Sequence, residues 1–341
     1  MTVSRKIRVA GAGVLGLAIA TTLARAGWRV EVFDPAPAAA NASGVAAGML
    51  APAFETILDP VSAGHFDLLL AARDLWPAFA AQNGVDLHRD GALSVGDEAR
   101  IAAHQQALSA LGLTPRLLSG VALTTLSPGL NPGLSHGVFT DADWRLDAQT
   151  ALEALRRAAR DLGVGFHSAA MQPDSAGLLV IATGAATGLP VLAPIKGHIV
   201  RVAAPGQSGP TVRGEGAYVV PSTAGFIVGA TMEPGVADDA VDPAKVAMLA
   251  AAGAQLFPQI AQSSAVGSVG VRAATPDGLP MVGWSERPDV LLAVGARRNG
   301  WLLAPLVAQT ILACLEQADP GSHGDRLTPG RFSPPRSGSG C

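Results

Sequence analysis

Residues 7–34 read IRVAGAGVLGLAIATTLARAGWRVEVFD, and this stretch decides the fold class. It opens with a short apolar run that is typical of a buried parallel strand. A GxGxxG motif follows at 11–16, and apolar positions then continue around a helix until Gly27. Residues 29–33 predict a second strand that ends at Asp34. This order of strand, glycine turn, helix and strand predicts a βαβ unit that binds a dinucleotide.

Each position of the glycine motif has a physical task. The first glycine permits a tight turn, the second lets the backbone approach a pyrophosphate, and the third lets the helix pack on the strand. Free N–H groups at the helix start then bind the diphosphate. A carboxylate at position 34 accepts hydrogen bonds from the adenosine ribose and repels a 2′-phosphate, which disfavours NADP. The expected dinucleotide contacts in this unit are Gly11, Gly13, Val14, Leu15, Gly16 and Asp34.

The composition favours a globular protein without a polyanion-binding surface. The chain has 341 residues, of which 49% are hydrophobic and 15% charged, so it can bury a large core. A formal net charge of -3 shows no basic excess, and we expect no nucleic-acid binding. Cys314 and Cys341 lie far apart and the histidines have no metal spacing, so we expect neither a disulfide framework nor a metal site. Cys314 falls in an apolar helix-like run and Cys341 in the tail, which disfavours covalent attachment of a cofactor.

The longest uncharged run, 178–195, is interrupted by glycines and prolines. We therefore expect two buried strands joined by a loop there, and no membrane span. No signal peptide is visible at the start, so a cytoplasmic location is expected. The end, 333–341, is rich in proline, glycine and serine and is predicted to be disordered. The sequence is compatible with a homo-oligomer but does not decide it.

The glycine motif alone does not choose between FAD and NAD, and the next segment bears on that choice. Residues 41–52 read NASGVAAGMLAP and consist almost wholly of small residues, which lets the backbone pass close to a bulky ligand. At this point the chain resembles the D-amino-acid-oxidase superfamily and, within it, the glycine oxidases of thiamine biosynthesis. The resemblance implies bound, non-covalent FAD, with this segment lining the pyrophosphate and the isoalloxazine ring. The implied contacts are Ser43, Ala47, Gly48, Met49 and Leu50.

The resemblance continues in family order through most of the chain and is weak only over about 55–140. The matching segments are LVIATGA at 179–185, PIKGH at 194–198, YVVP at 218–221, GFIVGATM at 225–232, VRAATPDGLP at 271–280 and RNGWLLAP at 298–305. They imply further flavin contacts at Thr183, Gly184, Arg272, Arg298, Asn299, Gly300, Trp301 and Leu302. Backbone N–H groups near Gly300, at the start of a helix-like run, would stabilise the negative charge that develops on a flavin when it is reduced.

Arg272 is the candidate for holding a substrate. It ends a strand-like alternation in an apolar region, and burying an unpaired charge costs several kcal/mol. A substrate carboxylate is a natural bidentate partner for its planar guanidinium. The alternative is a structural ion pair with Asp277 or another acid.

Three other residues are implied at the substrate by the resemblance. The hydroxyl of Tyr218, the sole tyrosine, would add a second hydrogen bond to the carboxylate. Met232 would flank the pocket, although methionine is by default a core gap-filler. Arg298 would also face the substrate. Together with Arg272 these residues form the predicted catalytic set.

Two departures from the family pattern put glycine itself in doubt as the substrate. Glycine oxidases carry a histidine and an aromatic residue before Arg-Asn-Gly, whereas this chain has Ala296 and Arg297. The family's Arg-Pro pair is here Arg272-Ala273. An added cation at position 297 would alter the pocket and favour a bulkier or acidic amino acid.

The predicted fold class is α/β, with a discontinuous Rossmann-type FAD-binding domain and an inserted α+β substrate domain on a mainly antiparallel sheet. Helical patterns are expected at 65–82, 97–111 and 147–162, the last capped by Asp147 and ended by Gly163. The FAD-binding domain is assigned to 1–54, 141–195 and 270–332, and the substrate-binding domain to 55–140 and 196–269.

The predicted reaction is oxidation of a small amino acid or amine. With Arg272 and Tyr218 on the carboxylate, the Cα–H points at flavin N5, hydride leaves to N5, and the imine hydrolyses to a 2-oxo acid and ammonia. Electrons then pass to O2, giving hydrogen peroxide, or to another acceptor. The alternatives are a D-amino-acid or sarcosine-type dehydrogenase with a non-oxygen acceptor, a flavin-binding protein without turnover, and an NAD-dependent dehydrogenase.

Overall fold

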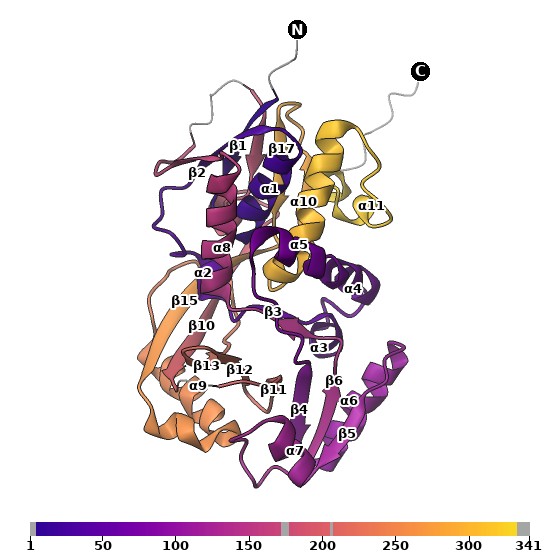
Figure 1. Cartoon of the computed structure of the whole chain (residues 1–341), viewed down its shortest axis with the longest axis vertical. Coiled ribbons are helices and arrows are strands. Elements are labelled where there is room, and N and C mark those ends of the chain that lie inside the picture. Colours follow the sequence, from indigo (N-terminus) through magenta and orange to yellow (C-terminus); the bar gives the residue numbers. More distant parts are fainter. Residues whose placement is uncertain (1–4, 172–176, 205–206, 333–341) are drawn as a thin grey trace.

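The computed structural model describes residues 5–171, 177–204 and 207–332. The predicted disordered tail, 333–341, lies outside them. Within the described residues, two large sheets account for most of the strands (Figure 1). The first sheet has six strands, in the order β16 (Met281–Trp284), β17 (Val290–Val294), β9 (Leu179–Ile181), β1 (Lys6–Ala10), β2 (Arg29–Phe33) and β8 (Gly165–His167).

The first sheet is parallel from β17 to β8, and only β16 pairs antiparallel. Its strands come from three separate parts of the chain, 6–33, 165–181 and 281–294. The expected βαβ unit is present: β1 leads through the glycine turn into α1 (Val14–Arg25), which ends before Gly27, where φ is +84°. This confirms the Rossmann-type unit of the predicted fold class.

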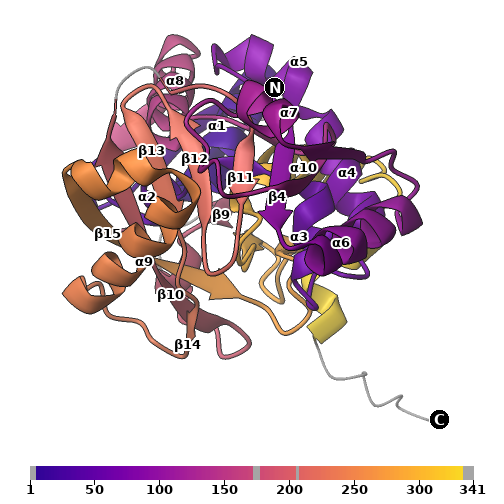
Figure 2. The same ribbon diagram turned by 90° about the horizontal axis from the view of Figure 1, so that it is seen from below.

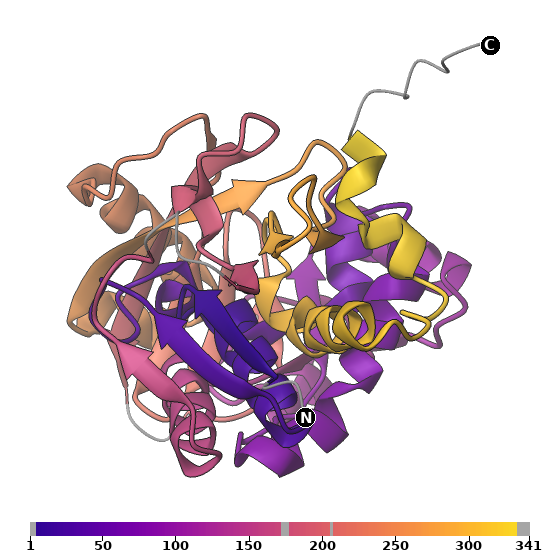
Figure 3. The ribbon, with the colours of Figure 1, turned by 90° about the horizontal axis from the view of Figure 1, so that it is seen from above.

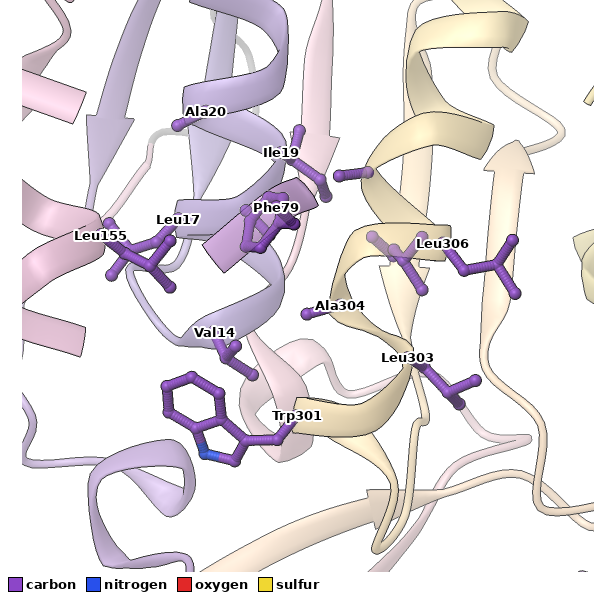
Figure 4. Packing of buried hydrophobic residues seen from close by; sticks show 14 of the residues in the cluster. Val14, Leu17, Ile19, Ala20, Phe79, Leu155, Trp301, Leu303, Ala304 and Leu306 are labelled. Atoms are coloured by element: carbon purple, nitrogen blue, oxygen red, sulfur yellow. The ribbon is translucent and has the colours of Figure 1, made fainter. Parts of the chain in front are cut away.

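Three helices pack over one face of this sheet: α1, α8 (Ala148–Asp161) and α10 (Gly300–Glu316). Figure 3 shows α10 in yellow beside the indigo helix α1. Figure 4 shows how Val14 and Ile19 of α1 meet Trp301 and Ala304 of α10. Small residues along α1 let the two helices approach closely, which holds the start of α10 next to the glycine turn.

The second sheet has nine strands and is mainly antiparallel, as predicted; β11 and β4 form a parallel pair within it. Its strands follow the order β14 (Glu233–Pro234), β10 (Ala193–Ala203), β13 (Gly225–Gly229), β12 (Tyr218–Ser222), β11 (Thr211–Arg213), β4 (Ala92–Gly96), β6 (His136–Thr140) and β5 (Arg116–Ser119), while β15 (Ala265–Ala274) also pairs with β10. Helix α9 (Pro243–Leu256) covers one face (Figure 2). Leu249 of α9 belongs there to one buried cluster with Val200, Val219 and Val228. The opposite face carries Ile199, Tyr218 and Ile227 and turns toward Ala47.

The remaining described elements lie outside the two large sheets. They are the helices α2 (Ala42–Val45), α3 (Pro52–Leu58), α4 (Phe66–Asp74), α5 (Trp76–Asn83), α6 (Glu98–Ala110), α7 (Val121–Leu126) and α11 (Gly324–Leu327), the 3-10 turns Gly184–Thr187, Pro258–Gln262 and Pro329–Phe332, and the two-stranded pair β3 (Met49–Leu50) and β7 (Trp144–Arg145).

Helix α8 confirms the expected cap at Asp147, and α6 has a cap of the same kind at Asp97. Asp97 and Asp147 each accept hydrogen bonds from first-turn amides, and Gly163 follows α8 with φ +81°. The helix expected at 65–82 is instead two helices, with the break at Leu75 just before Pro77. Proline lacks an N–H donor, so the hydrogen-bond ladder of α4 cannot continue through Pro77, and proline is tolerated in the first turn of a new helix.

The division into two domains stays a prediction, and the packing differs from it in one segment. Residues 55–83 were assigned to the substrate domain, yet Leu68, Trp76 and Phe79 of α4 and α5 are buried in the core of the first sheet. Strand β10 also begins at Ala193 and β15 ends at Ala274, so the second sheet extends slightly past the predicted boundaries.

None of the helices in the described residues is both long and apolar enough to cross a bilayer. The described histidines, cysteines and acids also form no cluster of three that could hold a metal ion. The run 178–195 forms β9, a 3-10 turn and the start of β10, in agreement with two strands and a loop.

Candidate active site

The glycine turn is closely packed for the reason that the motif predicts. Gly11 has φ +104°, and a Cβ there would lie 2.4 Å from the carbonyl oxygen of Ala182. A Cβ on Gly16 would lie 2.0 Å from the carbonyl oxygen of Gly11. Side chains are therefore excluded from both positions, and β1, β9 and α1 meet with backbone against backbone.

The N-terminus of α1 has no side-chain cap, and its N-cap residue is Gly13. The amide of Val14 donates to the hydroxyl oxygen of Ser43 at 3.0 Å. Asp34 accepts from the amide of Ala12 at 2.7 Å and from that of Ala36 at 2.9 Å. Asp34 thus lies at the end of β2 as predicted and also fixes the turn. The amide of Leu15 lies in the first turn of α1, where helix N–H groups have no intrahelical acceptor.

Thr183 and Gly184 follow β9 beside this turn. The Thr183 hydroxyl contacts that of Thr187 at 3.0 Å, and Gly184 has φ +57°. They lie next to Ala182 and Gly11, which places the second predicted flavin segment against the first. Neither residue lines the cavity described next.

The small-residue segment runs from α2 into β3 and turns sharply at Gly48. This glycine has φ +75°, and a Cβ there would lie 2.1 Å from the carbonyl oxygen of Leu146. Ala47, Gly48 and Met49 line a cavity, whereas the side chain of Leu50 is fully buried in the core. Any contact of Leu50 with a cofactor would therefore be through its backbone.

A cavity of about 460 Å³ lies between this segment, α3, the start of α10 and the open face of the second sheet. Nine predicted site residues line it: Ala47, Gly48, Met49, Tyr218, Met232, Arg272, Arg298, Asn299 and Trp301. The other lining residues are Ala46, Glu55, Leu58, Arg100, Ile199, Arg213, Gly214, Gly216, Ala217, Gly229 and Ala230. None of the described histidines is among them.

Arg272 lies across the sheet with its guanidinium at the cavity. It is surrounded by protein, which lowers its pKa by desolvation, and its remaining exposed surface is at the cavity. Its polar contact within the described part of the chain is from Nη1 to Sδ of Met232 at 3.6 Å. No ion pair to Arg272 occurs there. The alternative partner, Asp277, pairs instead with Arg331 at 2.8 Å.

A glycine on the neighbouring strand makes room for this arginine. Gly197 of β10 lies beneath the guanidinium, and a Cβ there would be 2.2 Å from Nη1 of Arg272. Tyr218 uses a second glycine in the same way, since a Cβ on Gly229 would be 2.4 Å from its hydroxyl oxygen. Both polar side chains therefore lean over bare backbone toward the middle of the sheet.

Burial raises the pKa of Tyr218, although Arg272 and Arg298 act in the opposite direction. The phenol is therefore neutral near pH 7 and can donate a hydrogen bond to an anion. The second predicted donor to a carboxylate thus shares one cavity with Arg272, on a common face of the sheet.

Arg298 is held by an acid that the sequence did not identify. Its Nε lies 3.1 Å from Oε2 of Glu55, and this carboxylate raises the pKa of Arg298. Arg213 lies 3.3 Å from Oε1 of the same Glu55. A single buried carboxylate is thus shared by two arginines, and Arg298 is less free to bind a ligand than Arg272.

The start of α10 closes the cavity from the side of the first sheet. Asn299 is its N-cap residue, without a side-chain cap bond, and Gly300 is its first residue. The indole N–H of Trp301 donates to the carbonyl oxygen of Ser43 at 3.0 Å, which joins α10 to the small-residue segment. Leu302 is a core residue, and its carbonyl accepts from the indole of Trp76.

Arg297 does not add a cation to the cavity, contrary to the expectation. Its guanidinium forms an ion pair with the buried Asp59, and it is absent from the lining. The sequence could not show this pairing because the two residues are remote in the chain.

Three charged lining residues were missed: Glu55, Arg100 and Arg213. Glu55 and Arg100 fall in the region of weak resemblance. The position of Arg213 offered a sequence signal, because it ends a short strand-like run shortly before Tyr218. In the structure the two residues are opposite each other in the register of β11 and β12.

Comparison with known proteins agrees with this arrangement. A glycine oxidase of Geobacillus kaustophilus is 29% identical over 94% of this chain and 95% of its own length. A putative thiamine biosynthesis oxidoreductase, ThiO, of Rhizobium etli is 32% identical over 92% of this chain and 98% of its own. The crystal structure of the Geobacillus glycine oxidase superimposes with a TM-score of 0.80 over 92% of this chain and 96% of that one. A family model described as DAO, FAD dependent oxidoreductase, matches residues 6–314, and the chain therefore belongs to the DAO family of FAD-dependent oxidoreductases.

Proposed function

We propose that this enzyme oxidises a small amino acid or amine, the kind of reaction for which the relatives named glycine oxidase are named. The observation that carries the proposal is Arg272, a guanidinium at the cavity wall with no acid partner among the described residues. An arginine so placed lacks the charge compensation that buried ions require, and a substrate carboxylate would supply it.

The residues of the first sheet fit the cofactor of the family. The uncapped start of α1, with Gly11, Gly13 and Gly16 free of side chains, fits a diphosphate. We propose that Asp34 also accepts from the ribose, and that Val14, Leu15, Ser43, Thr183 and Gly184 lie along the dinucleotide. The segment 47–50 and residues 298–302 would hold the ring between them. Bound FAD supplies the oxidising power, since it accepts two electrons from a substrate.

The protein's own part is to position the substrate. Arg272 would hold the carboxylate through two charge-assisted hydrogen bonds, and the neutral phenol of Tyr218 would donate a third. Met232, whose sulfur contacts Arg272, would flank the pocket and limit its size. A fixed carboxylate fixes the direction of the Cα–H bond, and such orientation lowers the barrier without an acid–base residue. Glu55 is an unsuitable base because it is shared by two arginines.

In the overall reaction the amino acid loses a hydride from Cα and a proton from nitrogen to give an imine. Water hydrolyses the imine to a 2-oxo acid and ammonia. With oxygen as acceptor, amino acid, O2 and water give 2-oxo acid, ammonia and hydrogen peroxide. For glycine the product is glyoxylate, and the name ThiO of one relative supports a role in thiamine biosynthesis. A cytoplasmic location remains part of this proposal.

Anaerobic mixing of the FAD-bound protein with a panel of amino acids tests the function. The panel contains glycine, sarcosine, D-alanine, D-proline and D-glutamate, and flavin absorbance is followed. We expect at least one compound to bleach the flavin, and a carboxylate-free amine of similar size to react far more slowly. Absence of bleaching with every compound would support a flavin-binding protein without turnover instead.

The electron acceptor is a separate question. A dehydrogenase of the same fold would reduce its flavin equally well but would yield little peroxide under air. Peroxide formed in a one-to-one ratio with oxidised substrate supports the oxidase, and slow reoxidation by oxygen supports another acceptor.

A further inference from the structure

The cavity carries more positive charge than one carboxylate can neutralise. Its lining includes four arginines, and Glu55 is the only acid in that lining within the described residues. Glu55 pairs with both Arg213 and Arg298, so one negative charge serves two cations. Arg272 and Arg100 form no ion pair in the described part of the chain. A substrate with a single carboxylate would therefore leave a net positive cavity.

Arg213 is the most deeply buried of these cations. Its side chain is 6% exposed. Its Nη2 contacts Oε1 of Glu55 at 3.3 Å and Sδ of Met49 at 3.5 Å. Its Nε is buried without a partner, and its Nη1 makes no hydrogen bond among the described residues. Because Arg213 lines the cavity, an anionic oxygen there would accept from Nη1.

The register of the sheet separates Arg213 from Arg272. Arg213 of β11 lies opposite Tyr218 of β12, which lies opposite Gly229 of β13. The phenol leans over Gly229, whereas the guanidinium of Arg272 lies beyond it, over β10. The Arg213 guanidinium carbon is 5.9 Å from the Tyr218 ring centre. Tyr218 thus stands between two guanidinium groups at opposite ends of the cavity floor.

Arg100 adds a second cation at the Arg213 end. It projects from the first turn of α6, and its Nη2 donates to the carbonyl oxygen of Gly214 at 3.3 Å. Its Nη1 makes no hydrogen bond among the described residues. Two guanidinium groups of the cavity lining, each with an Nη1 that donates to no described group, therefore lie near residues 213 and 214.

We propose that the substrate is an amino acid with a second carboxylate, and that Arg213, assisted by Arg100, binds that group. This inference rests on the proposed function, because it takes the α-carboxylate to be held by Arg272 and Tyr218. Arg213 is then the residue that determines specificity, and the chain between the two carboxylates crosses the face of Tyr218.

Isosteric pairs of compounds test the proposal on the unmodified FAD-bound enzyme. D-aspartate is compared with D-asparagine, and D-glutamate with D-glutamine, by anaerobic flavin reduction. Each pair differs in charge and hardly in size. We expect kcat/KM to be about 10- to 100-fold higher for the acid of at least one pair, the effect of a charge-assisted hydrogen bond. This comparison requires no variant.

The variant R213Q locates the effect. R213Q should lower the ratio of kcat/KM for the acid to kcat/KM for the amide about 10- to 100-fold. R213K keeps the positive charge but lacks the planar guanidinium, so it should lower this ratio less. R116Q is the matched control: Arg116 is exposed on β5, over the ring of Phe139, and its loss should leave the ratio unchanged.

The outcomes separate the inference from the function on which it rests. Flavin reduction by glycine, sarcosine or D-alanine without any preference for acid over amide would overturn the second-carboxylate site and leave the oxidase standing. An acid preference that R213Q does not reduce would also overturn the assignment to Arg213. Failure of every compound to reduce the flavin would overturn the proposed function itself.

Discussion

Replacing Arg272 by methionine should affect substrate binding and folding stability in very different degrees. The arginine makes no ion pair in the described part of the chain, so R272M leaves no orphaned acid behind. Methionine is unbranched and can fill the same path over Gly197 toward Met232. Removing an uncompensated, largely buried charge relieves a desolvation cost, part of which the cavity already relieves. We expect the free energy of unfolding to stay equal or to rise by about 0–2 kcal/mol.

Substrate binding should suffer far more. Two charge-assisted hydrogen bonds at about 1.5–3 kcal/mol each give a loss of about 3–6 kcal/mol. This corresponds to a fall in kcat/KM of about 100- to 10,000-fold for an amino acid. Flavin content should hardly change, because the dinucleotide turn lies around Gly11 and not at the cavity wall.

The assays are thermal unfolding of the FAD-bound protein without substrate, and anaerobic flavin reduction with substrate. R145M is the matched control for stability: the Arg145 side chain is 6% exposed, but it pairs with Asp90 at 2.8 Å. Its loss should destabilise the protein by about 1–3 kcal/mol. If R272M destabilised the protein as strongly as R145M, with equal loss of flavin and activity, Arg272 would be structural and the reasoning would be refuted.

Three further predictions follow from single contacts. G197A places a methyl group 2.2 Å from Nη1 of Arg272, which is the far end of a flexible side chain. The fold should therefore persist, while the displaced guanidinium should raise KM about tenfold or more. An unchanged KM in steady-state assays would show that Arg272 does not hold the substrate there. G13A places a methyl group 3.1 Å from the Ser43 hydroxyl oxygen, a contact that a small local adjustment relieves. The same methyl group fills the space over the N-terminus of α1, where the diphosphate is expected. FAD affinity measured by titration should therefore fall at least about tenfold, while the circular dichroism spectrum is retained. Burial raises the pKa of Asp143 to about 6 in the folded protein, above its value in the unfolded chain, so the protonated acid stabilises the fold and this stabilisation is lost between about pH 4 and 6. In denaturant titrations the free energy of unfolding of the wild type relative to D143N should therefore fall by about 2–3 kcal/mol from pH 4 to pH 7. A difference that does not change with pH would contradict this.

The elements set by local sequence were predictable. Strand β2 occupies the predicted residues, and β1 and the cap of α8 agree with them closely, because glycine turns, apolar periodicity and capping aspartates act within a few residues. The gathering of Tyr218, Arg272 and Arg298 at one cavity followed from the family resemblance rather than from any local signal.

The rest depends on contacts between distant parts of the chain. Glu55 meets Arg213 and Arg298 only because α3, β11 and the start of α10 converge, and no spacing in the sequence predicts that convergence. Arg297 was expected to add positive charge to the pocket, but it forms an ion pair with Asp59 instead. The packing of α4 and α5 on the first core was missed for the same reason.

A crystal structure of the FAD-bound protein with acetate tests the central claim most directly. The account predicts the acetate in the cavity, with both oxygens about 2.7–2.9 Å from the guanidinium nitrogens of Arg272 and the Tyr218 hydroxyl donating to one of them. Acetate bound elsewhere, with Arg272 paired to Glu55 or turned out of the cavity, would contradict it.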